Sequence, residues 1–330
     1  MPSPDIDCDD AVLGSNVPPL FGRFGRKAES RTVTYTSGTG LAFIAALWLA
    51  ATSAVHAQTA RAPDVRLGPT SDAVPGQDIA ENRPGDSATE IAKKLQNPVG
   101  DLISVPFTNY TNFNVGPNRG TQDVLQIQPV VPIHVNENWN VITRTVLPFV
   151  WSPSFQPAES VPPFGVAPTS FTAFLSPRNA VNGWVWGAGP VVQIPTISNK
   201  ALGSNVWGLG PSAVVVKMAG PVVAGVLVNN IFSLGGRPGR GGTQYNTFLL
   251  EPFFNYNFGG GWFVGTVPII TANWDRGGEK WTLPVGAQAG RVIRLGGRLP
   301  VKLEVGAYYN ALRPSGVGTW QLLTEAALVF

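Results

Sequence analysis

The chain has 330 residues, of which 44% are hydrophobic and only 13% charged, with 38 glycines and 30 prolines. A soluble domain normally has about 25% charged residues, so something replaces the usual charged surface. The net charge is +3, but part of the basic excess lies in an N-terminal segment that we expect to be removed, so it does not indicate a nucleic-acid partner. The single cysteine, Cys8, lies in the same segment, and we expect a mature chain without disulfides or cysteine metal ligands.

Residues 1–57 have the organisation of a secretory signal peptide with a long basic region. Four basic residues precede an apolar run over residues 41–57, which ends at Val55-His56-Ala57, a sequence that suits signal peptidase. The run has about 15 apolar residues, whereas a membrane-spanning helix needs about 20. We therefore predict export and removal of this segment. The length of chain before the run suggests a translation start downstream of Met1.

Residues 58–86 are predicted to be a disordered linker, and residues 87–97 a short amphipathic helix. The linker has four prolines among Asp, Arg, Gly and Ser, and it shows no apolar period. The helix is indicated by the capping-box spacing of Ser87 and Glu90 and by apolar residues at helical intervals. Asn97-Pro98 is expected to end it.

Residues 101–330 change character and predict an all-β fold, a transmembrane antiparallel up-and-down β-barrel. Stretches of about 9 to 15 residues alternate between apolar and polar positions, which is typical of strands with one face to lipid and one to water. Clusters of Gly, Asn, Pro and Asp separate them. We expect about twelve strands, because single-chain bacterial barrels have an even number. They lie at residues 101–115, 123–135, 139–151, 169–176, 183–196, 205–217, 221–234, 246–258, 262–274, 281–294, 299–312 and 318–330.

The connections between these strands alternate in length, which supports the barrel. Outer-membrane barrels have short periplasmic turns and longer extracellular loops. With the N-terminus in the periplasm, the short connections are periplasmic and have the residues of tight turns. The short set includes residues 136–138, 219–220, 259–261 and 295–298, and the long set includes 152–168, 197–204 and 235–245.

Aromatic residues are expected at both membrane interfaces. Trp139 and Trp151 are twelve residues apart, as are Trp262 and Trp274, so each pair shares one face of its strand. On a tilted strand this spacing matches the separation of two aromatic girdles. Core tryptophans of a soluble β-sandwich are the competing interpretation. The residues assigned to the girdles are Trp139, Trp151, Trp262, Trp274, Trp320 and Phe330.

The strand at 318–330 alternates regularly and ends in Phe330. Facing Glu325 to lipid would cost up to about 2 to 4 kcal/mol, so we expect Glu325 inside and Phe330 outside. An aromatic residue that closes such a strand resembles the signal by which outer-membrane barrels are recognised for assembly. The expected partners are therefore outer-membrane lipid and, through this strand, the barrel-assembly machinery.

Several phrases of the sequence resemble bacterial outer-membrane proteins of the MetA-pathway of phenol degradation family. They lie at residues 95–106, 112–117, 128–132, 174–177, 186–190 and 251–254. The resemblance covers roughly residues 91–330 and implies an outer-membrane transporter of small molecules, with aromatic or other hydrophobic compounds among the candidates. Pro168-Thr169-Ser170 departs from the Gly-Leu-Gly-Asp-like turn expected there, which puts the strand at 169–176 in question.

A catalytic site has few candidate residues. His134 is the one histidine after the expected signal peptide, near the predicted periplasmic end of the second strand. An outer-membrane phospholipase is a competing function, since it also uses a twelve-stranded barrel, but it needs a serine and a histidine oriented by a third polar group. No nucleophile motif accompanies His134. We therefore expect no enzymatic activity, no metal site and no cofactor.

The expected strand faces turn a mixed set of polar side chains into the lumen. Rings of one charge would indicate ion selectivity, whereas a mixture fits either a pathway for a small-molecule solute or a network that braces a nearly closed barrel. The predicted function is passage of a small molecule across the outer membrane, and a structural or adhesive outer-membrane protein is the alternative. The helix at 87–97 is too short to fill a lumen, which favours a tether over a plug or lid. The expected lumen residues are Gln126, Gln128, Arg144, Gln193, Glu251, Lys302, Glu304 and Glu325.

Overall fold

The computed structural model describes residues 87–153, 164–236 and 244–330. The predicted signal peptide at 1–57 and the predicted linker at 58–86 lie outside these residues. The described chain has one α-helix, two short 3-10 helices and fifteen strands, which form one antiparallel sheet. Within this part of the chain, no helix is both long enough and apolar enough to cross a membrane.

The helix α2 (Ala88–Leu95) comes first and has the predicted capping box. Glu90 donates its backbone N–H to Ser87 Oγ over 3.2 Å, and Ser87 donates its own to Glu90 Oε2 over 2.9 Å. The 3-10 helices are η3 (Lys200–Leu202) and η4 (Gly259–Gly261). The strands are β1 (Ser104–Val115), β2 (Gly120–Ile127), β3 (Val130–His134), β4 (Trp139–Trp151), β5 (Phe164–Val166), β6 (Thr169–Pro177), β7 (Trp184–Ile194), β8 (Gly208–Ala219), β9 (Val222–Ser233), β10 (Asn246–Asn257), β11 (Trp262–Thr266), β12 (Ile270–Asn273), β13 (Trp281–Leu295), β14 (Leu299–Leu312) and β15 (Trp320–Val329).

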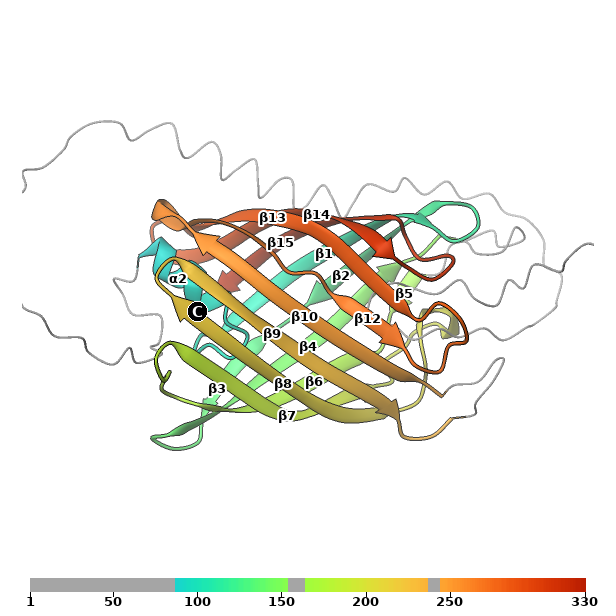
Figure 1. Cartoon of the computed structure of the whole chain (residues 1–330), viewed down its shortest axis with the longest axis horizontal. Coiled ribbons are helices and arrows are strands. Elements are labelled where there is room, and N and C mark those ends of the chain that lie inside the picture. The colour runs from blue at the N-terminus through green and yellow to red at the C-terminus, as the bar shows by residue number, and fades with distance from the viewer. Residues whose placement is uncertain (1–86, 154–163, 237–243) are drawn as a thin grey trace, which may run out of the picture.

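The sheet closes into a barrel whose wall the described chain crosses twelve times, which confirms the predicted fold (Figure 1). Each crossing pairs with the crossings before and after it in the sequence, and β15 pairs with β1 to close the ring. Three crossings consist of two strands each: β2 with β3, β5 with β6, and β11 with β12. Every crossing has a partner on both sides, so the ring is closed; the short strand β5 pairs with β4 alone.

Prolines interrupt three crossings that the sequence analysis treated as single strands. The interruptions fall at Pro129, at Pro168 and around Pro268. Proline has no backbone N–H to donate to a neighbouring strand. The strands predicted at 123–135 and 262–274 are each two strands in the structure. The crossing predicted at 169–176 also includes β5, which extends the pairing of β6 with β4.

The two ends of the barrel differ, as Figure 1 shows. The end at the left carries α2 and the chain terminus after β15, together with the short connections of β8 to β9, β10 to β11 and β13 to β14. Gly220, Gly296 and Gly297 have φ values of 54°, 59° and 73°, a left-handed backbone that tight turns require and glycine adopts readily. Short turns are periplasmic in outer-membrane barrels, so this end is the periplasmic one and the opposite end is extracellular.

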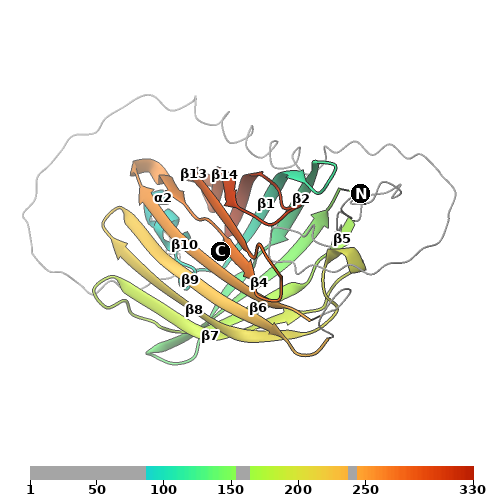
Figure 2. The same ribbon diagram turned by 45° about the vertical axis from the view of Figure 1, so that its right-hand side comes forward.

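The strands of the wall are tilted, as Figure 2 shows. Exposed aromatic side chains gather on the outer surface near both ends of these strands. Trp139 meets Trp186 at the periplasmic end with a ring separation of 5.8 Å, and Trp274 meets Trp281 at the extracellular end with one of 5.5 Å. Of the predicted girdle residues, all but the half-buried Trp139 are exposed. Trp139, Trp262 and Phe330 lie toward the periplasmic end, and Trp151, Trp274 and Trp320 toward the extracellular end.

One polar cluster departs from the apolar outer surface. Thr111 Oγ1 donates to Asp123 Oδ1 over 2.6 Å, and Asn109 Nδ2 lies 3.4 Å from the same oxygen. Asn109 and Thr111 alternate with the lumen-facing Tyr110 on β1, so they point outward, and Asp123 on β2 pairs in register with Thr111 and points the same way. Asp123 pairs in register with Trp151, at the depth of the extracellular aromatic residues. The hydroxyl and the amide therefore satisfy a carboxylate that would otherwise meet lipid.

We expect Thr111→Val to lower the free energy of unfolding by about 1.5–3 kcal/mol, because the carboxylate of Asp123 loses its shortest hydrogen bond in an isosteric change. Thr121→Val, at the exposed extracellular end of β2, is the matched control and is expected to stay within about 0.5 kcal/mol of the unmodified chain. Guanidinium unfolding in phospholipid vesicles, followed by tryptophan fluorescence, measures both. Equal stabilities of the two variants would contradict the expectation.

Candidate functional site

The interior of the barrel holds two cavities. The outer cavity has a volume of about 110 Å³ and is lined mainly by the extracellular halves of β4, β6, β7, β9, β10 and β12. The inner cavity has a volume of about 150 Å³ and is lined by the segment around residues 94–102 and by the periplasmic halves of β1, β10, β14 and β15. At 10–15 Å³ for each water, either holds on the order of ten waters. Only a small molecule fits such a space.

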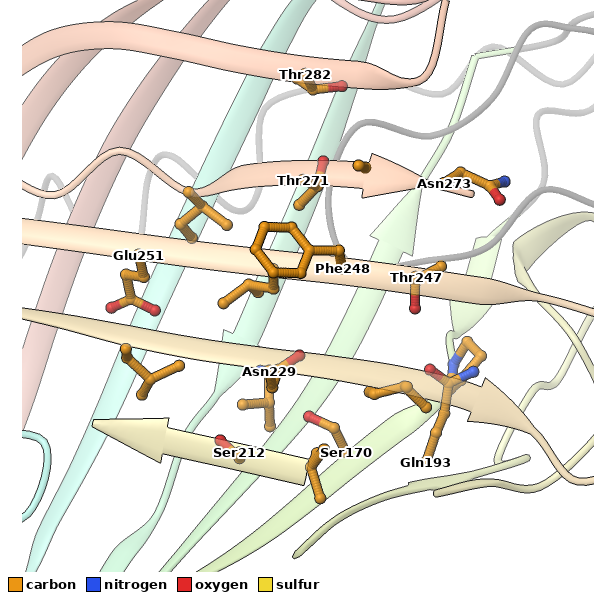
Figure 3. Close-up of a pocket in the computed structure, with 18 of the residues that line it drawn as sticks. Ser170, Gln193, Ser212, Asn229, Thr247, Phe248, Glu251, Thr271, Asn273 and Thr282 are labelled. Atoms are coloured by element: carbon orange, nitrogen blue, oxygen red, sulfur yellow. The ribbon is translucent and has the colours of Figure 1, made fainter. Parts of the chain in front are cut away.

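Figure 3 shows the outer cavity with Glu251 at one end and with Gln193 and Asn273 at the other. Its wall is mixed. Hydroxyl and amide groups come from β6, β7, β8, β9, β10 and β12, and between them lie apolar side chains such as Phe174 and Leu227. This cavity can therefore offer hydrogen bonds and apolar contacts to one molecule.

All eight side chains that the sequence analysis assigned to the lumen line these cavities. The aromatic residues Phe253 and Tyr308 are also buried in the interior, with exposures of 5% and 1%. Gln126 and Gln193 line the outer cavity, Gln128, Lys302, Glu304 and Glu325 line the inner cavity, and Arg144 and Glu251 line both.

Arg144, Glu251 and Ile269 line both cavities and so form the partition between them. Arg144 lies on β4 and Glu251 on β10, strands that no pairing connects, so their ion pair crosses the lumen. Arg144 Nη1 and Glu251 Oε2 are 3.7 Å apart. Arg144 Nη2 also donates to Gln128 Oε1 over 2.8 Å, which holds the guanidinium against its own wall.

Ile269 reaches the partition because the wall is interrupted there. Pro268 separates β11 from β12, and the backbone around it leaves the ladder of β10 and β13. Val267 donates its freed backbone N–H to the Tyr308 hydroxyl over 3.0 Å, and that hydroxyl donates to Gln288 Oε1 over 2.7 Å. These contacts fix the interrupted backbone, and Ile269 packs against two clusters of buried apolar side chains on either side of it.

A charged network covers one wall of the inner cavity. Lys302 Nζ lies 2.7 Å from Glu304 Oε2 and 2.7 Å from Glu325 Oε1. Thr108 Oγ1 donates to Glu325 Oε2 over 2.8 Å. The Lys302, Glu304 and Glu325 side chains have exposures of 12%, 3% and 13%. One ammonium group thus bridges two carboxylates that face each other from β14 and β15.

The segment from α2 to β1 closes the periplasmic end of the inner cavity. Gln96 and Asn257 exchange two amide hydrogen bonds of 3.0 and 2.9 Å. Val99 reaches across to pack with Phe174 and Val185 on β6 and β7. Residues 94–98, 100 and 102 line the cavity. This arrangement favours a plug over the tether that the length of the helix suggested.

The helix itself is fixed to the barrel wall. Ile91 and Ala92 are fully buried against Phe263 and Val292. Thr89 Oγ1 donates to Phe258 O over 3.1 Å and accepts from the Gly261 backbone N–H over 3.1 Å, at the turn between β10 and β11. The apolar face predicted from the sequence is therefore the face that seals the rim.

His134 lies at the periplasmic rim, away from both cavities. Its Nδ1 is 2.9 Å from Asn140 Oδ1, and its Nε2 is 3.8 Å from Asp101 Oδ1. Its side chain is 45% exposed. Over the residues that the structure describes, no three His, Cys, Asp or Glu side chains are grouped so as to hold a metal ion.

Three features of the site were not predicted from the sequence: Ile269, Tyr308 as an anchor of the interrupted strand, and the Gln96–Asn257 pair. Pro268 within the expected strand at 262–274 agrees with an interruption, because proline donates no backbone hydrogen bond. It is not a specific signal, since Pro190, Pro211 and Pro252 lie within unbroken strands. The amide pair had no local signal, since its two members are far apart in the sequence.

No protein-family model matches the chain, and no curated protein matches it. Among solved structures, the chain is similar to an outer membrane channel from Pseudomonas putida F1, with a TM-score of 0.52 and 17% identity over 71% of this chain and 97% of that chain. Outer membrane phospholipase from Salmonella typhi matches with a TM-score of 0.37 and 12% identity over 74% of this chain and 98% of that one. OmpF from Salmonella typhi matches with a TM-score of 0.34 and 10% identity over 69% and 96%.

The likeness to the Pseudomonas channel shows the fold, which is that of an outer-membrane β-barrel. The apolar, aromatic outer surface agrees with this fold, because such a surface needs lipid around it. The predicted location in the bacterial outer membrane is confirmed on these grounds.

Proposed function

We propose that this barrel is a channel through which a small molecule crosses the bacterial outer membrane. The observation that carries the proposal is the pair of cavities that meet at Arg144, Glu251 and Ile269. A path from the extracellular end passes the outer cavity, the partition and the inner cavity before it reaches the plug. Conduction requires that a channel bind its cargo weakly or at several successive sites, so that the cargo is also released. Two small cavities in series provide two such successive sites.

The proposed cargo is a small molecule with an apolar body and at least one polar group. Phe174, Leu227 and Leu249 contribute apolar surface to the outer cavity, between its hydroxyl and amide groups. The inner cavity, at about 150 Å³, has the volume of a cavity that holds one aromatic ring, and the outer cavity, at about 110 Å³, is smaller. The sequence resemblance to the MetA-pathway of phenol degradation proteins supports this choice.

We further propose that the protein has no enzymatic activity and that the strand β15 is what the assembly machinery recognises. His134 contacts Asn140 and Asp101 at a rim that neither cavity reaches, which supports a structural role for it. In a purely structural or adhesive barrel the interior polar groups would brace the wall by pairing with one another, whereas Gln193 Nε2 in the outer cavity has no hydrogen-bond partner within the described chain.

Solute passage through the barrel is tested by narrowing the partition. We expect Ile269→Trp to stop the swelling of liposomes in a small solute such as glycine or benzamide, because an indole at this position fills the space between the cavities. Ile270→Trp is the matched control: Ile270 pairs in register with Leu250 and points to lipid, so its larger side chain leaves the lumen unchanged. Equal swelling with both variants, or swelling no faster than in empty liposomes for the unmodified chain, would contradict the proposed channel.

A further inference from the structure

The guanidinium of Arg144 is held unequally by its two partners. Its bond to Gln128 Oε1 is 2.8 Å long, whereas Glu251 Oε2 is 3.7 Å from Nη1. Charge-assisted hydrogen bonds between such groups are normally about 2.7–2.9 Å long. By comparison, Lys302 lies 2.7 Å from each of its carboxylates. The ion pair across the partition is therefore loose, and a better-placed carboxylate can compete with Glu251.

Hydrogen-bond donors lead from the outer cavity to Arg144. Arg144 pairs in register with Thr172 on β6, and two residues further along β6 Ser170 pairs with Gln193 on β7. All four side chains line the outer cavity. They form a row on one wall of the barrel, from the extracellular side down to the partition.

Gln193 gives independent evidence of a ligand. Its side chain is buried, with 3% exposure, and faces the outer cavity. Its amide donor Nε2 has no hydrogen-bond partner within the described chain. A buried donor without a hydrogen-bond partner costs free energy, and an acceptor on a bound molecule would remove this cost.

The charges around the outer cavity favour an anion. Among the described residues that line it, Arg144, Arg276 and Lys280 are basic, and Glu251 is the acidic one. The inner cavity is balanced, with three basic and three acidic side chains among its described lining. An anion is thus attracted to the extracellular side of the partition more than to the inner cavity.

We propose that the outer cavity binds a small carboxylate, whose carboxylate group replaces Glu251 on Arg144 and so opens the partition. The proposal rests on the channel function above and names its cargo. The guanidinium matches a carboxylate with two parallel N–H donors, and the Gln193 amide and the Ser170 and Thr172 hydroxyls donate along the approach. The apolar body of the molecule packs on Phe174 and Leu227 across the same cavity.

Glu251 has two effects in this arrangement. In the empty channel it pairs with Arg144 and keeps the partition closed. When a carboxylate occupies Arg144, the released Glu251 lies beside it with the same charge, which weakens the binding and favours release toward the inner cavity. Binding and opening are therefore coupled by one exchange of ion-pair partners.

The test uses the chain folded in detergent and titrated by calorimetry with sodium benzoate and with its neutral isostere benzamide. We expect benzoate to bind and benzamide to bind at least roughly tenfold more weakly, because hydrogen bonds to a charged group are the stronger ones. Arg144→Met should lose the preference for benzoate. Gln193→Leu should weaken the binding of benzoate and should keep the shift in gel mobility on boiling that marks a folded barrel. Glu251→Gln should tighten benzoate binding, since the competing carboxylate is gone.

Gln321→Leu is the matched control for Gln193→Leu. Gln321 donates to Asn112 Oδ1 over 3.0 Å on another wall of the barrel, outside the lining of the outer cavity, so benzoate affinity should not change. Equal affinity for benzoate and benzamide, or weaker benzoate binding in Glu251→Gln, would overturn the carboxylate site. If benzamide still enters liposomes in that case, the channel function stands without the site; if no solute enters, the channel function fails by itself.

Discussion

Removal of residues up to Leu102 is expected to raise the conductance of the barrel severalfold in a planar lipid bilayer. The segment from α2 to β1 lines the inner cavity and crosses from β10 and β13 to β6 and β7. No barrel strand is lost by this truncation, because β1 begins at Ser104. The ring of strands therefore remains closed, and only the periplasmic seal is removed.

A milder variant serves as the control for this truncation. Gln96→Ala together with Asn257→Ala removes the reciprocal amide pair, at a cost of about 1–3 kcal/mol. The burial of Ile91, Val99 and Leu102 remains, and each such side chain contributes about 1.5–3 kcal/mol. The segment should therefore stay docked for most of the time and give brief openings rather than a steady current. If the truncated barrel conducts no better than the full chain, the partition at Arg144 and Glu251 is the tighter barrier.

The barrel and its two faces were predictable because each strand meets lipid on one side and the lumen on the other. This difference imposes a period of two that is visible in the sequence alone. β15 illustrates it: Glu325 lies beside Lys302 in the interior while Trp320 is exposed outside, as the alternation predicted. The turns were predictable for a similar local reason, since Gly220 and Gly296 adopt the left-handed backbone that tight turns need.

The interruptions and contacts across the lumen were not predictable in the same way. Alternation fixes which face a residue occupies but not how far the backbone leaves the wall, so the position of Ile269 required the structure. Arg144 and Glu251 meet because the ring closes with β4 and β10 on opposite sides of the lumen. The plug depends on contacts such as Val99 with Phe174, which join distant parts of the chain. Nothing in the local sequence around either partner specifies these pairs.

The charged network in the inner cavity makes Lys302 the side chain whose loss should destabilise the barrel most. Glu304 and Glu325 are register partners on neighbouring strands, and each has a carboxylate oxygen 2.7 Å from Lys302 Nζ. Lys302→Met keeps the apolar stem of the side chain but leaves two carboxylates facing each other without a cation. Breaking a buried ion pair in this way costs about 3–5 kcal/mol.

The triple variant Lys302→Met, Glu304→Gln, Glu325→Gln is expected to recover most of that loss, because replacing all charged members of a buried network is often neutral or stabilising. Lys217→Met is the control for loss of a lysine at the surface. Lys217 lies 5.2 Å from the centre of the Trp184 ring, a contact worth about 0.5–1 kcal/mol, and it also donates to the exposed Asn182 backbone carbonyl. Guanidinium unfolding in phospholipid vesicles gives all three values. A loss in Lys302→Met no larger than in Lys217→Met would mean that water in the inner cavity, rather than Lys302, compensates the two carboxylates.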